Sequence, residues 1–263
     1  MDTVRQPLTR LALRAASRAQ DLGFMALADV ARATEDPDGL RLIGGQMITL
    51  HAYRWSLGAE LFRESKDADV GVTEALVRDG GFIQRLEGMG YTQRRGGEFV
   101  RLLFEEAENG GDPPEAAIDV LVPARTSRAR ASRQIATHLV TSEVPGLATA
   151  LRRPPVPVEL AMTRLDETRL TATIILPDEV ATLVLRAHAW RTRLTDTDAE
   201  DLWRGLEIAY AAGVAPSDFR TADERRAGAI TREAFERDGG MASLAVGNRI
   251  GRVRALIARV LGP

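Results

Sequence analysis

The stretch Arg41-Leu-Ile-Gly-Gly-Gln-Met-Ile-Thr-Leu-His-Ala-Tyr53 begins as a short apolar run, turns at two glycines and continues with helical spacing, which predicts a helix from about Gln46 to Leu57. A glycine pair lets the backbone turn sharply and lets a ligand approach the main chain closely. The unpaired N–H groups at a helix start attract anions, because these donors and the positive end of the helix dipole point the same way. Gly44 and Gly45 are therefore candidate phosphate-binding residues.

The stretch Phe62-Arg-Glu-Ser-Lys-Asp-Ala-Asp-Val-Gly-Val72 follows, and we predict that it is extended. Asp67 and Asp69 are two residues apart, so in a strand both carboxylates lie on one face, with their Cα atoms roughly 6–7 Å apart. Two like charges at that distance repel each other unless a cation lies between them. The two aspartates are therefore candidate metal ligands.

The same alternation places Arg63 and Ser65 on the face that carries the two aspartates. We expect both side chains to reach phosphate oxygens beside the cation. Lys66, the only lysine of the chain, falls on the opposite face, which favours a surface or packing role.

Asp119 interrupts an apolar run, from Ala116 to Pro123, that is typical of a strand. An acidic residue there is disfavoured by β-propensity and by the cost of desolvation unless a partner neutralises it. Asp119 therefore either faces solvent or supplies a third metal carboxylate from a neighbouring strand.

The composition narrows the possible metal sites. The chain of 263 residues contains no cysteine, which excludes disulfides, thiolate metal sites and a cysteine nucleophile. A zinc site rich in histidine is disfavoured, because only three histidines occur, far apart in the sequence: His51, His138 and His188. Any metal here should be a hard cation held by carboxylates. The phosphate site beside the carboxylate pair indicates a nucleotide held with Mg²⁺.

Hydrophobic residues make up 44% of the chain and charged residues 27%, as in an ordinary globular protein, and the formal net charge is −2. No global basic field attracts nucleic acid, so a polyanion partner would need a local patch. The run from Ala124 to Arg133 offers one, and it is either a contact surface for a phosphate backbone or a solvated loop. Its arginines are Arg125, Arg128, Arg130 and Arg133.

Met1–Pro7 has neither the basic nor the apolar segment of a signal peptide, and no window approaches the length of a membrane span. We expect a cytoplasmic protein without a membrane partner.

The remaining patterns predict an α+β fold: a mixed sheet with flanking helices, followed by a C-terminal helical bundle. We place an N-terminal domain at residues 1–177, with its core at about 38–123, and a helical domain at residues 178–263. The other predicted elements are a helix over 8–20, a short helix over 26–33, a hairpin from Val158 to Leu176, a Gly/Pro-rich loop from Glu108 to Pro114, and helices over about 179–193, 198–212, 222–237 and 241–262. Trp190, Trp203 and His188 fit ordinary packed positions in these helices.

The chain contains Gly44-Gly45, then Arg63-x-Ser65-x-Asp67-x-Asp69, then a third aspartate on a later strand. This pattern resembles that of the DNA polymerase β-like nucleotidyltransferase superfamily. The longer arrangement resembles the abortive-infection AbiE-type toxins of type IV toxin–antitoxin systems. That family also has a helix with a lysine and a later arginine, followed by Lys-Asp-x-x-Asp-Leu. Here Leu185-Arg-Ala-His-Ala-Trp-Arg-Thr-Arg193 leads to Thr197-Asp198-Ala-Glu-Asp201-Leu202.

The resemblance implies a nucleotidyltransferase fold and transfer of a nucleoside monophosphate from an NTP to an acceptor hydroxyl. In that family pattern Asp67, Asp69 and Asp119 hold two Mg²⁺ ions. Arg186 replaces the family's lysine; it still neutralises a triphosphate but does not lose a proton. Asp198 and Asp201 match residues of the nucleotide or acceptor site, although Thr197 with early acids also fits an ordinary helix start.

By the same resemblance, the acceptor is RNA, namely a tRNA 3′ end, and the protein is a toxin with a cognate antitoxin. Two alternatives remain open. The acceptor is a protein side chain or a small molecule, or the chain is a catalytically silent nucleotide-binding regulator.

Overall fold

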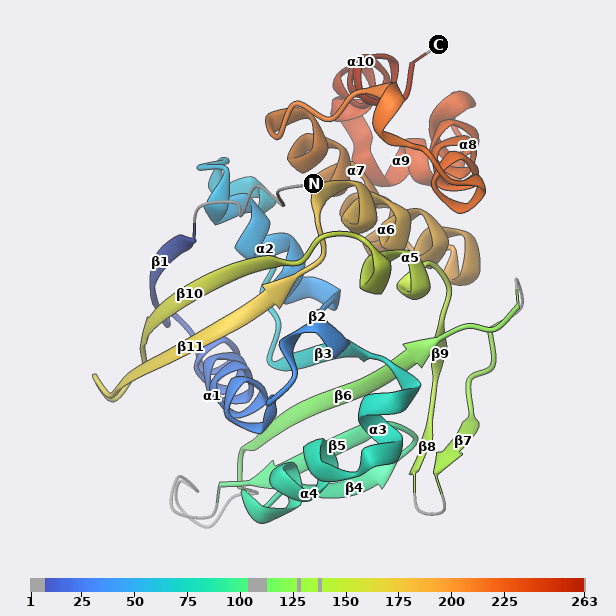
Figure 1. The fold of residues 1–263 in the computed structure, drawn as a ribbon. Coiled ribbons are helices and arrows are strands. Elements are labelled where there is room, and N and C mark those ends of the chain that lie inside the picture. The colour runs from blue at the N-terminus through green and yellow to red at the C-terminus, as the bar shows by residue number, and fades with distance from the viewer. Residues whose placement is uncertain (1–7, 104–112, 127–128, 137–138, 263) are drawn as a thin grey trace.

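A computed structural model describes residues 8–103, 113–126, 129–136 and 139–262, and shows mixed sheets with helices packed on them, followed by a helical C-terminal region (Figure 1). Within these residues, no helix combines the length and the apolar character that crossing a membrane requires.

The central sheet carries the predicted acidic strands. Its main path runs in the order β2-β3-β6-β5-β4, and β9 pairs with the end of β6. The neighbours β3 and β6 are parallel, whereas β2 pairs antiparallel with β3, and β5 pairs antiparallel with both β6 and β4. The strands are β2 (Leu40–Leu42), β3 (Asp67–Val72), β4 (Thr92–Arg95), β5 (Glu98–Leu102), β6 (Glu115–Pro123) and β9 (Glu143–Val144).

Short elements surround this sheet. The helices are α2 (Gly44–Arg54), α3 (Glu74–Asp79), α4 (Gly81–Gly88) and α5 (Leu147–Arg152), and a separate two-stranded ribbon consists of β7 (Arg133–Ala136) and β8 (Leu139–Thr141). The predicted Glu108–Pro114 loop lies mostly outside the described residues, as do Arg128 and His138.

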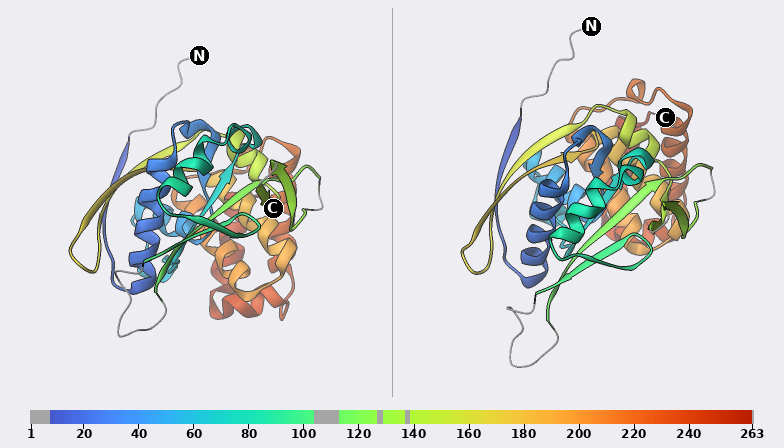
Figure 2. Two further views of the ribbon diagram at one scale, coloured as in Figure 1. Left: turned by 90° about the horizontal axis from the view of Figure 1, so that it is seen from below. Right: turned by 60° about the horizontal axis from the view of Figure 1, so that its bottom comes forward.

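A second sheet has the order β1-β10-β11, with β1 (Thr9–Arg14) parallel to β10 (Val156–Thr163) and β10 antiparallel to β11 (Arg169–Leu176). The predicted hairpin is thus confirmed. Figure 2 shows helix α1 (Arg18–Ala33) between this sheet and the central one. Apolar side chains of α1 and of both sheets share one core, which includes Leu27, Val70, Ile118 and Ile174.

The predicted helix over residues 8–20 is wrong in its first half. Thr9–Arg14 is a strand, and the helix begins at Arg18, after Ser17, whose side chain accepts a hydrogen bond from the N–H of Gln20. The leucines Leu11 and Leu13 are two residues apart, which suits a strand as well as a helix. Pairing with β10, far away in the sequence, decided between the two.

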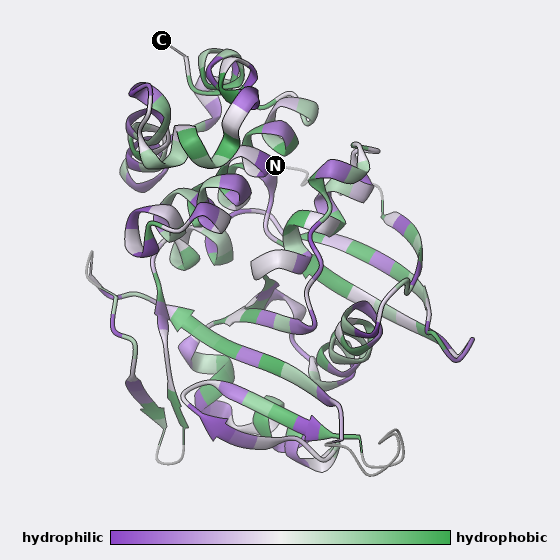
Figure 3. Cartoon of the chain, turned by 180° about the vertical axis from the view of Figure 1, so that it is seen from behind, coloured by the Kyte–Doolittle hydropathy of each residue, from purple (hydrophilic) through white to green (hydrophobic). Residues whose placement is uncertain are grey.

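The C-terminal region consists of α6 (Glu179–Arg193), α7 (Asp196–Ala211), α8 (Ala222–Glu236), α9 (Met241–Val246) and α10 (Ile250–Val260). Trp190 and Trp203 lie in its buried core, as predicted. Hydrophobic and hydrophilic residues mix along these helices, whereas β6, β10 and β11 are largely apolar (Figure 3). The predicted single helix over 241–262 is wrong, because the chain breaks at Gly247, which has φ +56°.

Candidate metal and nucleotide site

The three predicted metal aspartates meet on one face of the central sheet. Asp69 on β3 lies directly opposite Asp119 on the parallel strand β6. Each of Asp67, Asp69 and Asp119 offers a carboxylate oxygen, and these oxygens all lie within 4.8 Å of one another. The arrangement favours the metal-ligand interpretation of Asp119 over the interpretation in which it simply faces solvent.

Burial and mutual repulsion perturb two of these carboxyl groups. Burial raises the pKa of Asp69 to about 7, with further contributions from the charges of Asp67 and Asp119, partly offset by Arg186 and Arg63. Burial and the charges of Glu98 and Asp67 raise the pKa of Asp119 to about 6. A set of carboxylate oxygens that resist ionisation together fits a hard divalent cation such as Mg²⁺ or Mn²⁺.

Gly44 brings the start of α2 against Asp69. Its φ is +72°, and a Cβ atom there would lie 1.7 Å from an Asp69 carboxylate oxygen. The N–H of Ile43 donates to the backbone oxygen of Asp69 over 2.8 Å. Only glycine fits this position without displacing the carboxylate. Gly45 follows in the first turn, where a Cβ atom would come within 3.2 Å of the Arg63 side chain.

The first turn of α2 provides anion-binding donors next to the carboxylates. The residue before the helix, Ile43, has no side chain that can cap it. The N–H groups of the first turn therefore remain available to a phosphate. The helix begins at Gly44 and ends at Arg54, so the predicted range from Gln46 to Leu57 is shifted toward the C-terminus.

The segment before Asp67 is irregular, not a strand, because β3 begins only at Asp67. The alternation that grouped Arg63 and Ser65 with the aspartates therefore does not apply, yet both side chains lie near the site. Ser65 Oγ donates to a carboxylate oxygen of Asp67 over 2.6 Å. Arg63 forms an ion pair with Asp201. Lys66 is exposed, in agreement with the prediction.

Asp201 on α7 is a fully buried counter-ion. Its carboxylate accepts hydrogen bonds from Arg63, from Arg186 over 3.2 Å and from Arg204 over 2.9 Å. Arg186 on α6 also donates to the carbonyl oxygen of Gly44. Asp201 thus holds two of the arginines whose charges act on Asp69, and its own oxygens are occupied by protein donors.

Asp198 plays a similar part for an arginine that the sequence analysis missed. Arg193 donates to Asp198 over 2.9 Å, and Thr195 donates to the same carboxylate over 2.7 Å. The hydrogen bond with Asp198 raises the pKa of Arg193, and the charge of Asp69 adds to that effect. Arg193 follows Arg186 by seven residues on α6, about two helical turns, so the two arginines share one side of that helix. Thr195, not Thr197, caps α7. Two signals pointed to it: its place in the last turn of α6 and the later arginine of the family helix motif.

Two of the arginines after β6, Arg125 and Arg133, form ion pairs within the protein. Arg125 and Arg133 both bind Glu74, and Arg133, which is buried, also binds Glu143. These pairs fasten the segment to α3 and β9. Two of the four arginines proposed as a phosphate-backbone contact thus have structural partners in the protein.

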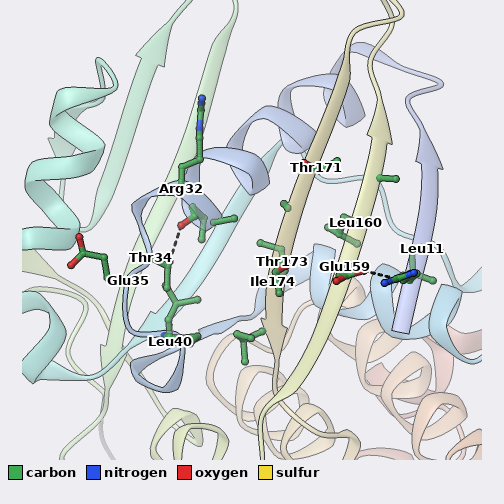
Figure 4. A pocket seen from close by; sticks show the side chains of 17 residues that line it. Leu11, Arg32, Thr34, Glu35, Leu40, Glu159, Leu160, Thr171, Thr173 and Ile174 are labelled. Carbon is green, nitrogen blue, oxygen red and sulfur yellow. Dashed lines mark hydrogen bonds and ion pairs between the residues drawn. The ribbon is translucent and has the colours of Figure 1, made fainter. Parts of the chain in front are cut away.

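A cavity of about 710 Å³ lies elsewhere, between the end of α1 and the sheet of β1, β10 and β11 (Figure 4). Apolar side chains such as Leu160 and Ile174 line it, and an ion pair between Arg10 and Glu159 lies at its edge. Its lining includes none of the predicted site residues.

The chain matches no model of a known protein family, and no curated protein is significantly similar to it in sequence.

Proposed function

We propose that this protein is a metal-dependent nucleotidyltransferase, which moves a nucleoside monophosphate from an NTP to an acceptor hydroxyl and releases pyrophosphate. The observation that carries the proposal is the convergence of Asp67, Asp69 and Asp119 beside the uncapped, glycine-started helix α2. The carboxylates suit the positive metal ion of a metal–triphosphate complex, and the adjacent helix start suits its negative phosphates.

The residues of the site fall into two sets, one that would bind the metal and one that binds the triphosphate. Asp67, Asp69 and Asp119 would hold Mg²⁺, which when bound polarises the reacting phosphate and neutralises the leaving pyrophosphate. The first turn of α2 and the surrounding arginines bind and orient the triphosphate. These arginines are Arg63, Arg186 and Arg193, and the buried acids Asp201 and Asp198 fix their side chains.

The transfer step forms a bond between the acceptor oxygen and the α-phosphorus. It breaks the bond between the α-phosphorus and the oxygen that bridges to the β-phosphate, and pyrophosphate leaves with that bonding pair. The proton of the acceptor hydroxyl passes to a carboxylate oxygen of Asp119, which is half-buried, and from there to solvent.

The acceptor and the biological role follow the resemblance. We propose an RNA hydroxyl, namely a tRNA 3′ end, as the acceptor, and a role as the cytoplasmic toxin of a toxin–antitoxin pair. Support comes from the shared pattern of Gly44, Gly45, the three aspartates and the α6–α7 motif, whose members the fold brings to one place.

The experiment that tests this function follows label from each α-³²P-NTP, with Mg²⁺, into total RNA and total protein. Wild type is compared with Asp69→Asn and Asp119→Asn, and with Asp238→Asn as a control at an exposed acid. Label on RNA that both site variants lose and the control keeps supports the proposal and identifies the nucleotide. Label on protein moves the acceptor to a side chain, and no label with any NTP removes the RNA-modifying assignment.

A further inference from the structure

A polar groove of about 340 Å³ adjoins the candidate site at Asp119. Its walls come from the turn between β4 and β5, from β6 and from the neighbouring residues Ala131, Ser132 and Ser142. In the sheet order β2-β3-β6-β5-β4, β5 and β4 lie on one side of β6, which carries Asp119, and β3 with Asp69 lies on the other. We refer to it as the Asp119 groove.

Acidic side chains connect the groove to the metal site. Asp69, Asp119 and Glu98 lie directly opposite one another on β3, β6 and β5, so their side chains share one face of the sheet. Asp119 and Glu98 both line the groove. A molecule in the groove therefore contacts the same carboxylate that would hold the metal.

Two cations near the groove have no carboxylate partner among the described residues. Arg95 lines the groove, and Lys66 precedes β3; both are exposed. Arg95 lies directly opposite Glu98 in the β4–β5 pairing. Lys66 directly precedes Asp67, whose carboxylate oxygen lies within 4.8 Å of that of Asp119. Arg94, by contrast, binds Glu98 and Glu115 over 2.6 and 2.9 Å. Arg95 and Lys66 are thus available to an anionic ligand.

The in-line geometry of nucleotidyl transfer indicates from which side of the site the acceptor approaches. In phosphoryl and nucleotidyl transfer, the attacking oxygen and the leaving group lie roughly in line on opposite sides of the phosphorus. The leaving phosphates would occupy the side of α2, Arg63 and Arg186, so the acceptor has to approach from the side of Asp119.

We propose that the Asp119 groove is the acceptor site, and that the acceptor carries a phosphate group close to its reacting hydroxyl, which Arg95 and Lys66 bind. The proposal rests on the proposed nucleotidyltransferase function. Both an RNA 3′ end and a free nucleotide have this chemistry. A guanidinium binds phosphate through paired N–H donors. At Gly96, in the β4–β5 turn, an added Cβ atom would have no neighbour within 4 Å, so this turn leaves room for the acceptor beside the backbone.

The test measures binding of a short, 5′-fluorescein-labelled single-stranded RNA by fluorescence anisotropy at several salt concentrations. The variants are Arg95→Glu, Lys66→Glu and the double variant, with Arg226→Glu on α8 as an exposed control of equal charge change. Each groove variant should weaken binding and reduce the salt slope by about 0.7 per lost phosphate contact, and the control should match wild type. If AMP displaces the labelled RNA from the wild type but not from Arg95→Glu, one nucleotide suffices as acceptor. If only unlabelled RNA displaces it, the acceptor is a polynucleotide.

Wild-type affinity and salt slope in the double variant would overturn the proposal, as would the absence of any RNA or AMP binding. Mn²⁺ and NTP titrations of the same proteins separate this result from a failure of the proposed function. If RNA binding depends on Arg95 but the wild type binds neither Mn²⁺ nor NTP, the nucleotidyltransferase function fails and the groove is not an acceptor site. If Mn²⁺ and NTP each bind the wild type and the groove variants equally, while the variants raise only the KM for RNA, the acceptor assignment stands.

Discussion

Asp69 faces Asp119 across the parallel strands β3 and β6, while its own carboxylate fills the space where any side chain on Gly44 would begin. One residue therefore links the metal carboxylates to the phosphate-binding turn. The position of this carboxylate depends on two neighbours, and it carries a pKa of about 7 because burial and like charges oppose its ionisation. Changes at Asp69 and Gly44 should consequently affect both stability and ligand binding.

Asp69→Asn should stabilise the metal-free protein at pH 8 and have little effect at pH 4. An acid whose folded-state pKa is raised from 3.8 to about 7 binds its proton more tightly when folded, so stability falls as pH rises between these values and is constant above them. The difference corresponds to an upper limit of about 4 kcal/mol at pH 8. Urea unfolding in EDTA at both pH values checks this, with Asp238→Asn as the control. A loss of stability at pH 8 would contradict the assignment of a repulsive carboxylate cluster.

Mn²⁺ should bind more weakly as the pH is lowered from 8 to 5, because a cation has to displace the protons that Asp69 and Asp119 hold below pH 7 and pH 6. Below those values each bound ion should release protons to the buffer. Calorimetric titration with Mn²⁺ in two buffers of different ionisation enthalpy measures the affinity and the protons together. An affinity that does not change with pH would show that these carboxyl groups are not the ligands.

Gly44→Ala should weaken Mn²⁺ binding at least about tenfold, because the new Cβ would overlap the Asp69 carboxylate and displace it. It should also cost about 1–3 kcal/mol of stability, since alanine is strained at φ +72°. Gly251→Ala is the matched control: Gly251 lies in α10 with no atom within 4 Å of the added Cβ, and alanine should stabilise that helix by about 0.5–1 kcal/mol. Mn²⁺ titration and thermal unfolding of both variants make the comparison.

Asp201→Asn should destabilise the protein by about 3–5 kcal/mol, because it leaves the buried Arg186 and its neighbours without their counter-charge. Added NTP should restore part of this stability if the triphosphate binds the same arginines. Glu200→Gln, which removes a more exposed partner of Arg204, should cost less than about 1 kcal/mol. Denaturant unfolding with and without NTP gives both numbers, and equal losses in the two variants would argue against a special role for Asp201.

The sequence allowed much of the local structure to be predicted. Period-2 and helical patterns gave the hairpin of β10 and β11 and the helix α6 from Glu179 to Arg193, because these segments match one pattern clearly. The spacing of Asp67 and Asp69 and the isolated charge of Asp119 predicted one cluster, and the sheet register brings it together. Local patterns did not resolve Thr9–Arg14, whose strand conformation depends on pairing with a segment about 150 residues away.

The roles of the other charged residues could not be inferred from sequence position. Spacing grouped Arg63 with the aspartates and placed Asp201 in the nucleotide site, but the fold joins these two residues in a buried ion pair. It also engages Arg125 and Arg133 with acids and leaves Arg95 without a carboxylate partner in the described structure.

The sequence by itself determined which residues can bind a hard cation or a phosphate, because that chemistry belongs to carboxylates, guanidinium groups and glycine turns. The tertiary structure alone decided which of them act together, because ion pairing and desolvation depend on distances between segments far apart in the chain.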